Sequence, residues 1–168
     1  MTTTPLGRLL RTDIGADLIL TRTYRAPIED VWASLTEPDR TARWYGTWKG
    51  EAGPDRMISV QMAFEEGQPW TEMRVGACEP PRRLQISAVD DEGSWHLEVR
   101  LSESSGTTEL HFTHHLTGAN EIALIPQVGP GWEYYLDNFS AARTGSPQPD
   151  FNDYYPSMKP YYEALTAQ

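Results

Sequence analysis

Between residues 57 and 116 the apolar residues recur at every second position, in five consecutive segments. This period places neighbouring side chains on opposite faces of an extended chain and predicts β-strands. The segments are joined by short stretches rich in Gly, Pro, Asp and Ser, which favour hairpin turns. We therefore expect an antiparallel meander that is apolar on one face and polar on the other. The predicted strands are 57–64, 70–77, 83–89, 94–101 and 108–116, and the turns are 65–67, 80–81, 90–93 and 104–106.

On both sides of the meander the apolar period changes to that of a helix. Residues 17–25 form a further alternating strand, and Pro27 then suits the first turn of a helix whose apolar stripe runs to Leu35. A second short helix is predicted from the Thr36-Glu37-Pro38-Asp39 segment to about Trp44, because a hydroxyl and an acid stand at capping-box spacing. After Gly129-Pro130-Gly131 comes a longer helix that ends near Gly145, with a stripe formed by Trp132, Tyr135, Leu136, Phe139 and Ala142.

These elements predict an α+β fold in which a curved antiparallel sheet of six to seven strands surrounds the long C-terminal helix. The helix is the one segment long and aromatic enough to cover the apolar face, so we expect a cavity between the two. We divide the chain into an N-terminal arm (1–16), the main domain (17–145) and a Pro- and Tyr-rich tail (146–168). The tail is expected to form a strap and a short helix capped by Ser157, with Pro160 in its first turn. The strap covers either its own domain or a neighbouring copy in a homodimer.

Charge and cysteine content narrow the classes of function. The 168 residues carry a formal net charge of −10, and no basic run is present, which argues against binding to nucleic acid or to an anionic membrane. Cys78 is the single cysteine, as expected for a reducing compartment. No apolar run approaches the length of about 20 residues that spans a bilayer. We therefore expect a cytoplasmic protein without a membrane span.

The order of these elements resembles a known superfamily. The segments TRTYRAPIEDVWASLTEPDRTARWYG (21–46), CEPPRRL (78–84) and GWEYYLDNF (131–139) are similar to those of START-like, polyketide cyclase (SRPBCC) proteins with the helix-grip fold. Within that superfamily the chain resembles the branch named for the heat-shock protein 90 ATPase activator, over residues 17–143. The resemblance implies a fold and a cavity, with functions that range over lipid or polyketide binding, ring cyclisation and interaction with a chaperone.

The histidines do not predict a metal site. On a strand that rises about 3.3 Å per residue, His111 and His115 share a face but stand about 13 Å apart, and His114 points to the other face. His114 takes the place of an apolar residue beside Leu110, Phe112 and Leu116. It is either a buried histidine hydrogen-bonded to a tyrosine or an acid, or a polar anchor or general base in the cavity.

Large aromatic residues are the main candidates for the cavity lining, as core residues, as ligand contacts or as both. The predicted ligand-binding set is Trp44, Trp48, Met62, Trp70, Trp95, Phe112, His114, Trp132, Tyr135 and Phe139. Glu72 and Arg74, and likewise Glu98 and Arg100, are expected to lie on the solvated outer face. Met73, Val75, Leu97 and Val99 are expected to face inward.

Three functions remain open. The first is the binding of an apolar or aromatic small molecule in the cavity, and the second is a protein-interaction module of the chaperone-activator kind. The third is a cyclase- or hydrolase-type enzyme, with His114 and Tyr135 as acid–base candidates. No phosphate- or dinucleotide-binding fingerprint and no Gly-x-Ser-x-Gly motif is present, so we expect no cofactor and lean against catalysis.

Overall fold

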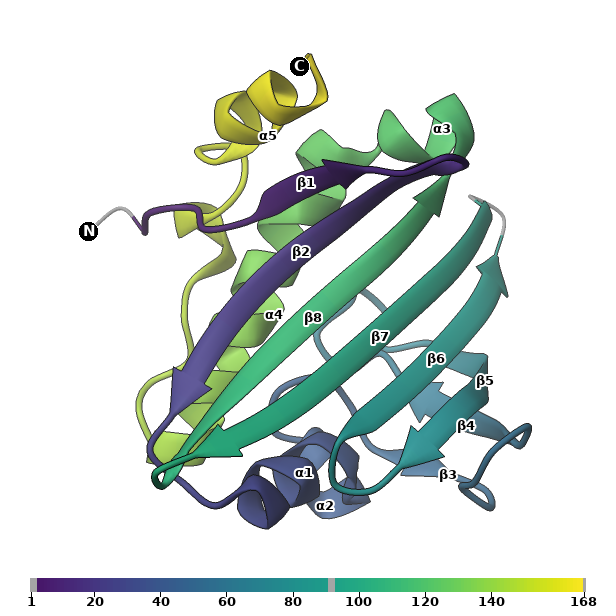
Figure 1. Cartoon of the computed structure of the whole chain (residues 1–168), viewed down its shortest axis with the longest axis vertical. Helices are drawn as coiled ribbons and strands as arrows, with labels where there is room; N and C mark the ends of the chain where they lie inside the picture. The colour runs from purple at the N-terminus through teal and green to yellow at the C-terminus, as the bar shows by residue number, and fades with distance from the viewer. Residues whose placement is uncertain (1–2, 91–92, 168) are drawn as a thin grey trace. The chain divides into compact units, whose positions relative to one another are not determined.

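The computed structural model describes residues 3–90 and 93–167, and it has the predicted α+β class. Hydrogen bonds join eight strands into an antiparallel sheet in the order β1-β2-β8-β7-β6-β5-β4-β3 (Figure 1). With the long helix α4 near the C-terminus these are the elements of the helix-grip fold, which confirms the expected fold class. The strands are β1 (Arg8–Arg11), β2 (Gly15–Tyr24), β3 (Trp48–Lys49), β4 (Met57–Gln61), β5 (Trp70–Glu79), β6 (Arg83–Asp90), β7 (Gly93–Ser104) and β8 (Thr107–Thr117). The helices are α1 (Ile28–Thr36), α2 (Pro38–Thr41), α3 (Gly118–Ile122), α4 (Ile125–Thr144), the 3-10 helix η1 (Phe151–Asp153) and α5 (Lys159–Thr166).

The sheet has eight strands where six to seven were expected. The two additional strands, β1 and β3, are short and were not predicted. β1 lies in the segment expected to be an arm, and it pairs with β2 from Arg8 opposite Ile19 to Arg11 opposite Ala16. The turn between them is closed by the Gly15 amide, which donates to Thr12 Oγ1 at 3.1 Å. A side chain at Gly15 would come within 2.0 Å of the Leu116 carbonyl oxygen, so β2 and β8 can meet there only with glycine. Strands of two to four residues are too short to show a period of their own.

The chain divides into two compact units, each described here by itself. The first comprises residues 3–21 and 113–167 among those described. In it α4 starts before the predicted position and runs through Pro130, although proline lacks the N–H that a helix interior uses. Gly129 and Pro130 are both buried, and the ring of Tyr162 fills the space where a Gly129 side chain would lie, with atoms from 2.5 Å. Packing therefore overrides the local preference of the Gly-Pro-Gly segment to end a helix.

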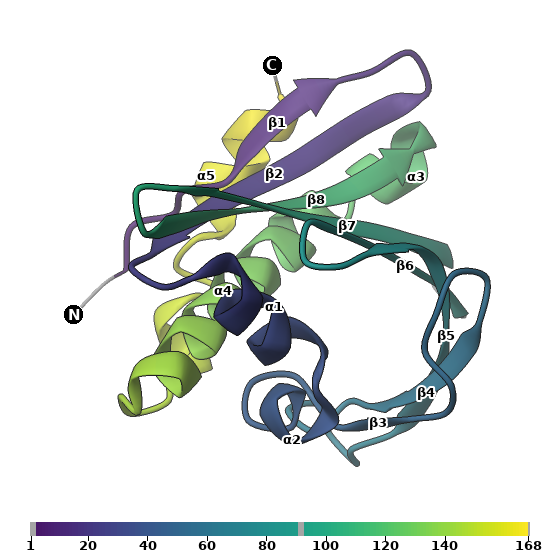
Figure 2. The same cartoon turned by 60° about the horizontal axis from the view of Figure 1, so that its bottom comes forward.

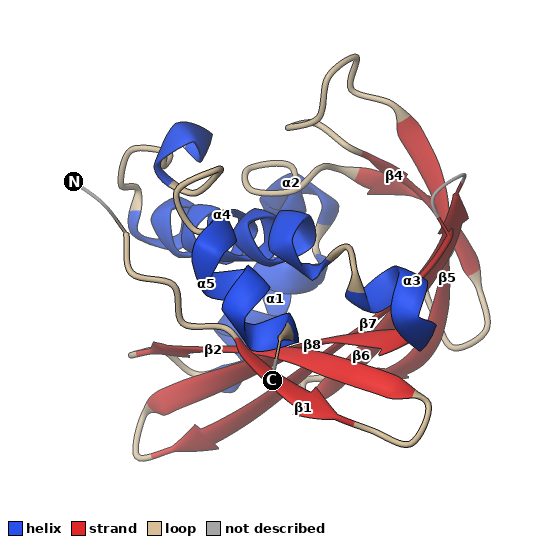
Figure 3. Ribbon diagram, turned by 90° about the horizontal axis from the view of Figure 1, so that it is seen from above, coloured by secondary structure: helices blue, strands red, loops and turns tan. Residues whose placement is uncertain are grey.

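The tail lies against its own unit. Helix α5 packs beside α4 and β1 (Figure 3). The buried carboxylate of Glu133 on α4 accepts the Tyr162 hydroxyl at 2.7 Å and the amides of Leu6 and Gly7 at 2.6 and 3.2 Å. The tail, the N-terminal segment and α4 are thus joined at one buried acid, which stabilises all three.

The start of α5 differs in part from the prediction. Pro160 is in its first turn as expected, but the residue at the cap position is Met158. The Ser157 hydroxyl instead donates to the Asp153 carbonyl at 2.8 Å, which ties it to the preceding turn. A serine can satisfy either the helix in front of it or the chain behind it, and the sequence pattern does not separate the two.

The second unit comprises residues 22–112 apart from 91–92. Its strands β3 to β7 follow one another in antiparallel register, and α1 and α2 belong to the same unit (Figure 2). The amide of Ile28 at the start of α1 donates to Glu103 Oε1 on β7 at 2.6 Å. Two residues of the expected 90–93 turn lie outside the described residues. The second predicted helix is shorter than expected and ends at Thr41. The Thr36 hydroxyl, expected to cap it, donates back to the Trp32 carbonyl instead.

None of the described helices combines the length and the apolar character needed to cross a bilayer.

Candidate functional site

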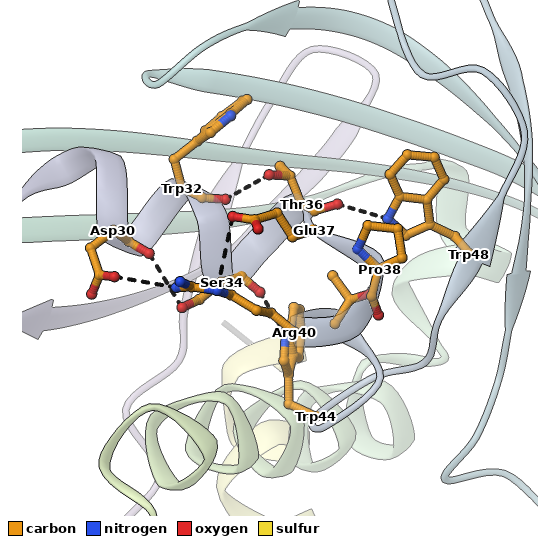
Figure 4. Close-up of polar contacts among 10 residues, drawn as sticks. Asp30, Trp32, Ser34, Thr36, Glu37, Pro38, Arg40, Trp44 and Trp48 are labelled. Atoms are coloured by element: carbon orange, nitrogen blue, oxygen red, sulfur yellow. Dashed lines mark hydrogen bonds and ion pairs between the residues drawn. The ribbon is translucent and has the colours of Figure 1, made fainter.

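Trp44 and Trp48, two predicted site residues, donate hydrogen bonds to backbone carbonyls at the C-terminal end of α1. The last carbonyls of a helix have no partner within the helix, and α1 has no basic residue in its last turn. The Trp44 indole Nε1–H donates to the Ser34 carbonyl at 3.0 Å, and the Trp48 Nε1–H donates to the Thr36 carbonyl at 2.7 Å (Figure 4). With these polar tips engaged, each indole presents its ring as apolar surface.

The ring of Trp48 belongs to a continuous apolar surface in the second unit. Its centre is a buried cluster of Ile58 and Val60 on β4 with Met73 and Val75 on β5. Partly buried residues pack around this cluster, and we call the whole set the apolar face. These surrounding residues are Tyr45, Trp48, Met62, Cys78, Leu84, Ile86 and Ala88. The expected inward direction of Met73 and Val75 agrees with this cluster.

The strand register extends the apolar face onto β7. Residues directly opposite each other in an antiparallel pair point to the same side of the sheet. Trp95 is opposite Ala88, Leu97 is opposite Ile86, and Val99 is opposite Leu84. Trp95 therefore shares the side of the apolar face.

The opposite side of these strands carries the charged residues. Trp70 is 47% exposed there, with the Lys49 ammonium 4.3 Å from the centre of its ring. The Arg74 guanidinium bonds Asp55 at 2.8 Å, and the Ser59 hydroxyl donates to Glu72. The structure therefore places Trp70 away from the other aromatic candidates of this unit.

Glu98 also lies on that side but is not solvated as expected. Its carboxylate is buried beneath Arg83 and Arg100, at 2.7 and 3.0 Å. Arg83 also reaches Glu79 at 2.9 Å, and its hydrogen bonds to Glu98 and Glu79 raise the pKa of its guanidinium. The alternation predicted the face correctly, but the two long arginine side chains cover the carboxylate, which a period of two cannot reveal.

Tyr45 is a member of the apolar face that the sequence analysis did not single out. Its backbone carbonyl accepts from the Ala63 amide at 3.3 Å, beside Met62. The adjoining Gly46 lies so close to β4 that a side chain there would come within 1.5 Å of the Gln61 carbonyl oxygen. Burial and the nearby charge of Glu65 raise the pKa of Tyr45 above its ordinary value, so the phenol stays neutral further into the alkaline range. Gly46, directly after Tyr45, is the feature of the sequence that indicates this close approach to β4.

The remaining candidate of the second unit is Phe112, and the single cysteine, Cys78, also lies in this unit. Burial raises the pKa of the Cys78 thiol, which therefore behaves as a small apolar group. Phe112 is buried on β8 on the same side as Leu110.

In the first unit the structure brings together the predicted residues His114, Trp132 and Tyr135. His114 is 2% exposed, and its Nδ1 accepts the Trp132 indole N–H at 3.1 Å. Since an indole nitrogen only donates, the neutral imidazole carries its proton on Nε2. The Trp132 ring lies 6.0 Å from His114 and 6.0 Å from Tyr135, between centroids. Trp132 is thus one partner of the buried histidine, and Phe139 is buried on the same helix as Trp132.

Two other histidines are bonded to carboxylates. His115 Nδ1 is 2.7 Å from Asp17, and His111 bonds Glu109. In the part of the chain that the structure describes, no three His, Cys, Asp or Glu side chains gather as a metal site requires.

Several solved structures are similar to this chain. The crystal structure of CalU16 from Micromonospora echinospora matches with a TM-score of 0.76 and 26% identity over 100% of both chains. The solution structure of the protein encoded by gene BPP1335 from Bordetella parapertussis matches with a TM-score of 0.70 and 24% identity, over 100% of this chain and 95% of that one. DynU16, described as a protein in the dynemicin biosynthetic locus, has a TM-score of 0.67 and 19% identity, over 80% of this chain and 50% of that one.

A comparison with curated proteins found no match. The family model for Activator of Hsp90 ATPase homolog 1-like protein matches residues 25–143, well over half of the 168 residues. This chain therefore belongs to the Activator of Hsp90 ATPase homolog 1-like protein family.

Proposed function

We propose that this protein binds an apolar, aromatic small molecule on the apolar face. The observation that carries the proposal is the ring of half-buried aromatic and sulfur-bearing side chains around the buried β4–β5 cluster. Ligand sites for small molecules are lined mainly by apolar and aromatic side chains with few polar groups. Thioether and thiol groups make favourable contacts with aromatic rings and adapt to irregular shapes. Met62, Met73 and Cys78 supply such groups beside Tyr45 and Trp48.

Two comparisons support a binding function for this fold without identifying the ligand. The chain shares its fold with CalU16 over its whole length, and with DynU16, whose description refers to a biosynthetic locus. A fold alone does not determine function, so the proposal rests on the side chains of the apolar face.

A pair of methionine variants tests the proposal. Met62 packs on the apolar face, whereas Met57 is 55% exposed and lies opposite Arg74 on the charged side. The probe is N-phenyl-1-naphthylamine, an uncharged aromatic compound whose fluorescence rises in apolar surroundings. We expect Met62→Glu to weaken its binding by about tenfold or more, because a carboxylate would have to be desolvated there.

The exposed variant Met57→Glu is the matched control and should bind as the wild type does. Absence of probe binding to the wild-type protein, or equal losses in the two variants, would contradict the proposal. Circular dichroism and urea unfolding of both variants establish that each is folded.

A second candidate function is docking to a chaperone. The description of the family and the exposed edge of the sheet at β1 support it. β1 has a sheet partner on one side only, and Leu10 and Ile14 in this hairpin are 58% and 72% exposed. Exposed apolar side chains beside an unpaired strand edge are features of protein-interaction surfaces. Retention of a purified chaperone of the heat-shock 90 class by wild type but not by Leu10→Asp would support this function. Equal retention by wild type and Leu10→Asp would show that the β1 edge is not the docking surface.

A further inference from the structure

The surroundings of Tyr45 restrict the charge of what the apolar face can hold. We infer that the face selects uncharged aromatic molecules over anionic ones, such as aryl sulfonates and carboxylates, and that Glu65 is the residue that enforces this selection. The inference rests on the proposed function and specifies its ligand class.

The first step is the position of Glu65. Residues 62–69 form a turn after β4, in which the Glu65 amide donates to the Met62 carbonyl at 3.0 Å and the Gln68 amide donates to the Glu65 carbonyl at 3.0 Å. The same turn is bonded to the Tyr45 carbonyl through the Ala63 amide at 3.3 Å. The backbone of Glu65 is therefore held next to Met62 at the margin of the apolar face, in the turn that is bonded to Tyr45.

The second step is that the carboxylate acts electrostatically on this margin. The charge of Glu65 contributes, after burial, to raising the pKa of Tyr45. An anion within reach of the same phenol would be disfavoured in the same way as the phenolate is. Repulsion between like charges is strong where apolar side chains exclude water and weak in bulk solvent.

The third step is the placement of the neighbouring cation. Lys49 follows Trp48 on β3, so its side chain points to the other side of the strand. Its ammonium lies over the Trp70 ring on that side. The lysine of this strand therefore does not offset Glu65 on the apolar face. Tyr45 and Met62, which adjoin Glu65, bring a neutral phenol and a thioether and no positive charge.

A matched pair of probes tests the inference. N-phenyl-1-naphthylamine is uncharged, and 1-anilinonaphthalene-8-sulfonate carries the same ring system with one sulfonate. Fluorescence titration at low ionic strength, where a partly exposed carboxylate is least screened, gives both dissociation constants. We expect the sulfonate to bind wild type at least about tenfold more weakly.

Two variants that each replace a glutamate by glutamine test whether Glu65 causes the weaker binding of the sulfonate. Glu65→Gln should strengthen binding of the sulfonate several-fold and leave the uncharged probe unchanged. Glu66→Gln removes the same charge from the next position, which is exposed as Glu65 is, and should change neither constant. Equal affinity of wild type for both probes, or equal effects of the two substitutions, would overturn the inference while leaving the proposed function standing. Failure of both probes to bind would overturn the proposed function and the inference with it.

Discussion

At the scale of single residues, several polar atoms buried among apolar side chains bond to specific partners. The indole N–H groups of Trp44 and Trp48 donate to the last carbonyls of α1, and that of Trp132 donates to His114 Nδ1. Tyr162 gives its hydroxyl to the buried Glu133. Because a buried polar group without a partner is costly, these bonds determine which way each large side chain turns.

Tyr162 makes stability depend on pH in the alkaline range. Burial and then the Glu133 carboxylate raise the pKa of Tyr162 above its ordinary value near 10. The unfolded chain releases this proton near pH 10 while the folded protein retains it, so the unfolded state binds fewer protons and stability falls as the pH rises. The stabilisation is complete below that pH, and Tyr45 adds to the decline because its pKa is raised as well. Above pH 10 we expect up to about 1.4 kcal/mol less unfolding free energy per pH unit for each such tyrosine.

Urea unfolding between neutral and alkaline pH measures the slope. Tyr162→Phe should be less stable than wild type at neutral pH and should lose stability less steeply above pH 10. A variant that declines with the wild-type slope would contradict this assignment.

At the scale of elements, the packing of α5 in the tail against α4 requires a glycine at position 129. A side chain at Gly129 would lie 2.5 Å from the Tyr162 ring, whereas one at Gly131, two residues further along α4, would meet nothing within 4 Å. We expect Gly129→Ala to destabilise the protein by about 1–3 kcal/mol, because the ring must move out of a well-packed position. Gly131→Ala should be neutral or stabilising by up to about 1 kcal/mol, since alanine favours a helix.

Chemical denaturation of the two alanine variants tests this difference directly. Hydrogen exchange in β1 adds a second measurement, because the N-terminal segment is bonded to the same Glu133. Equal stability of the two variants would show that Tyr162 does not rely on the space at Gly129.

At the scale of the whole molecule, periodicity predicted the elements that carry their own pattern. The strand expected at 108–116 is observed as Thr107–Thr117, and the strand expected at 94–101 as Gly93–Ser104. The elements that were missed are held by distant contacts, which local pattern does not encode. β1 exists because β2 pairs with it, and the first turns of α4 continue through Pro130 because the tail packs there.

The candidate site was predictable to a lesser degree, for the same reason. Alternation placed Met73, Val75, Leu97 and Val99 on the correct side of the sheet. Tyr45 was missed because a turn brings it to β4. Trp70 lies on the outward side with Glu72 and Arg74, as alternation along β5 indicates, and its aromatic character alone was a poor guide to a ligand contact. The ligand-binding role of the predicted residues stays a prediction.

Methionine methyl groups offer the most direct test of the central claim that the apolar face binds an aromatic molecule. Met62 and Met73 belong to this face, whereas Met57 lies on the charged side and Met158 is buried in the tail. Protein with 13C-labelled methionine methyl groups is titrated with N-phenyl-1-naphthylamine, whose rings shift the resonances of nearby methyl groups. The account predicts saturable shifts of the Met62 and Met73 methyl signals, with those of Met57 and Met158 unmoved. Binding that shifts Met57 or Met158 while Met62 and Met73 stay in place would contradict it.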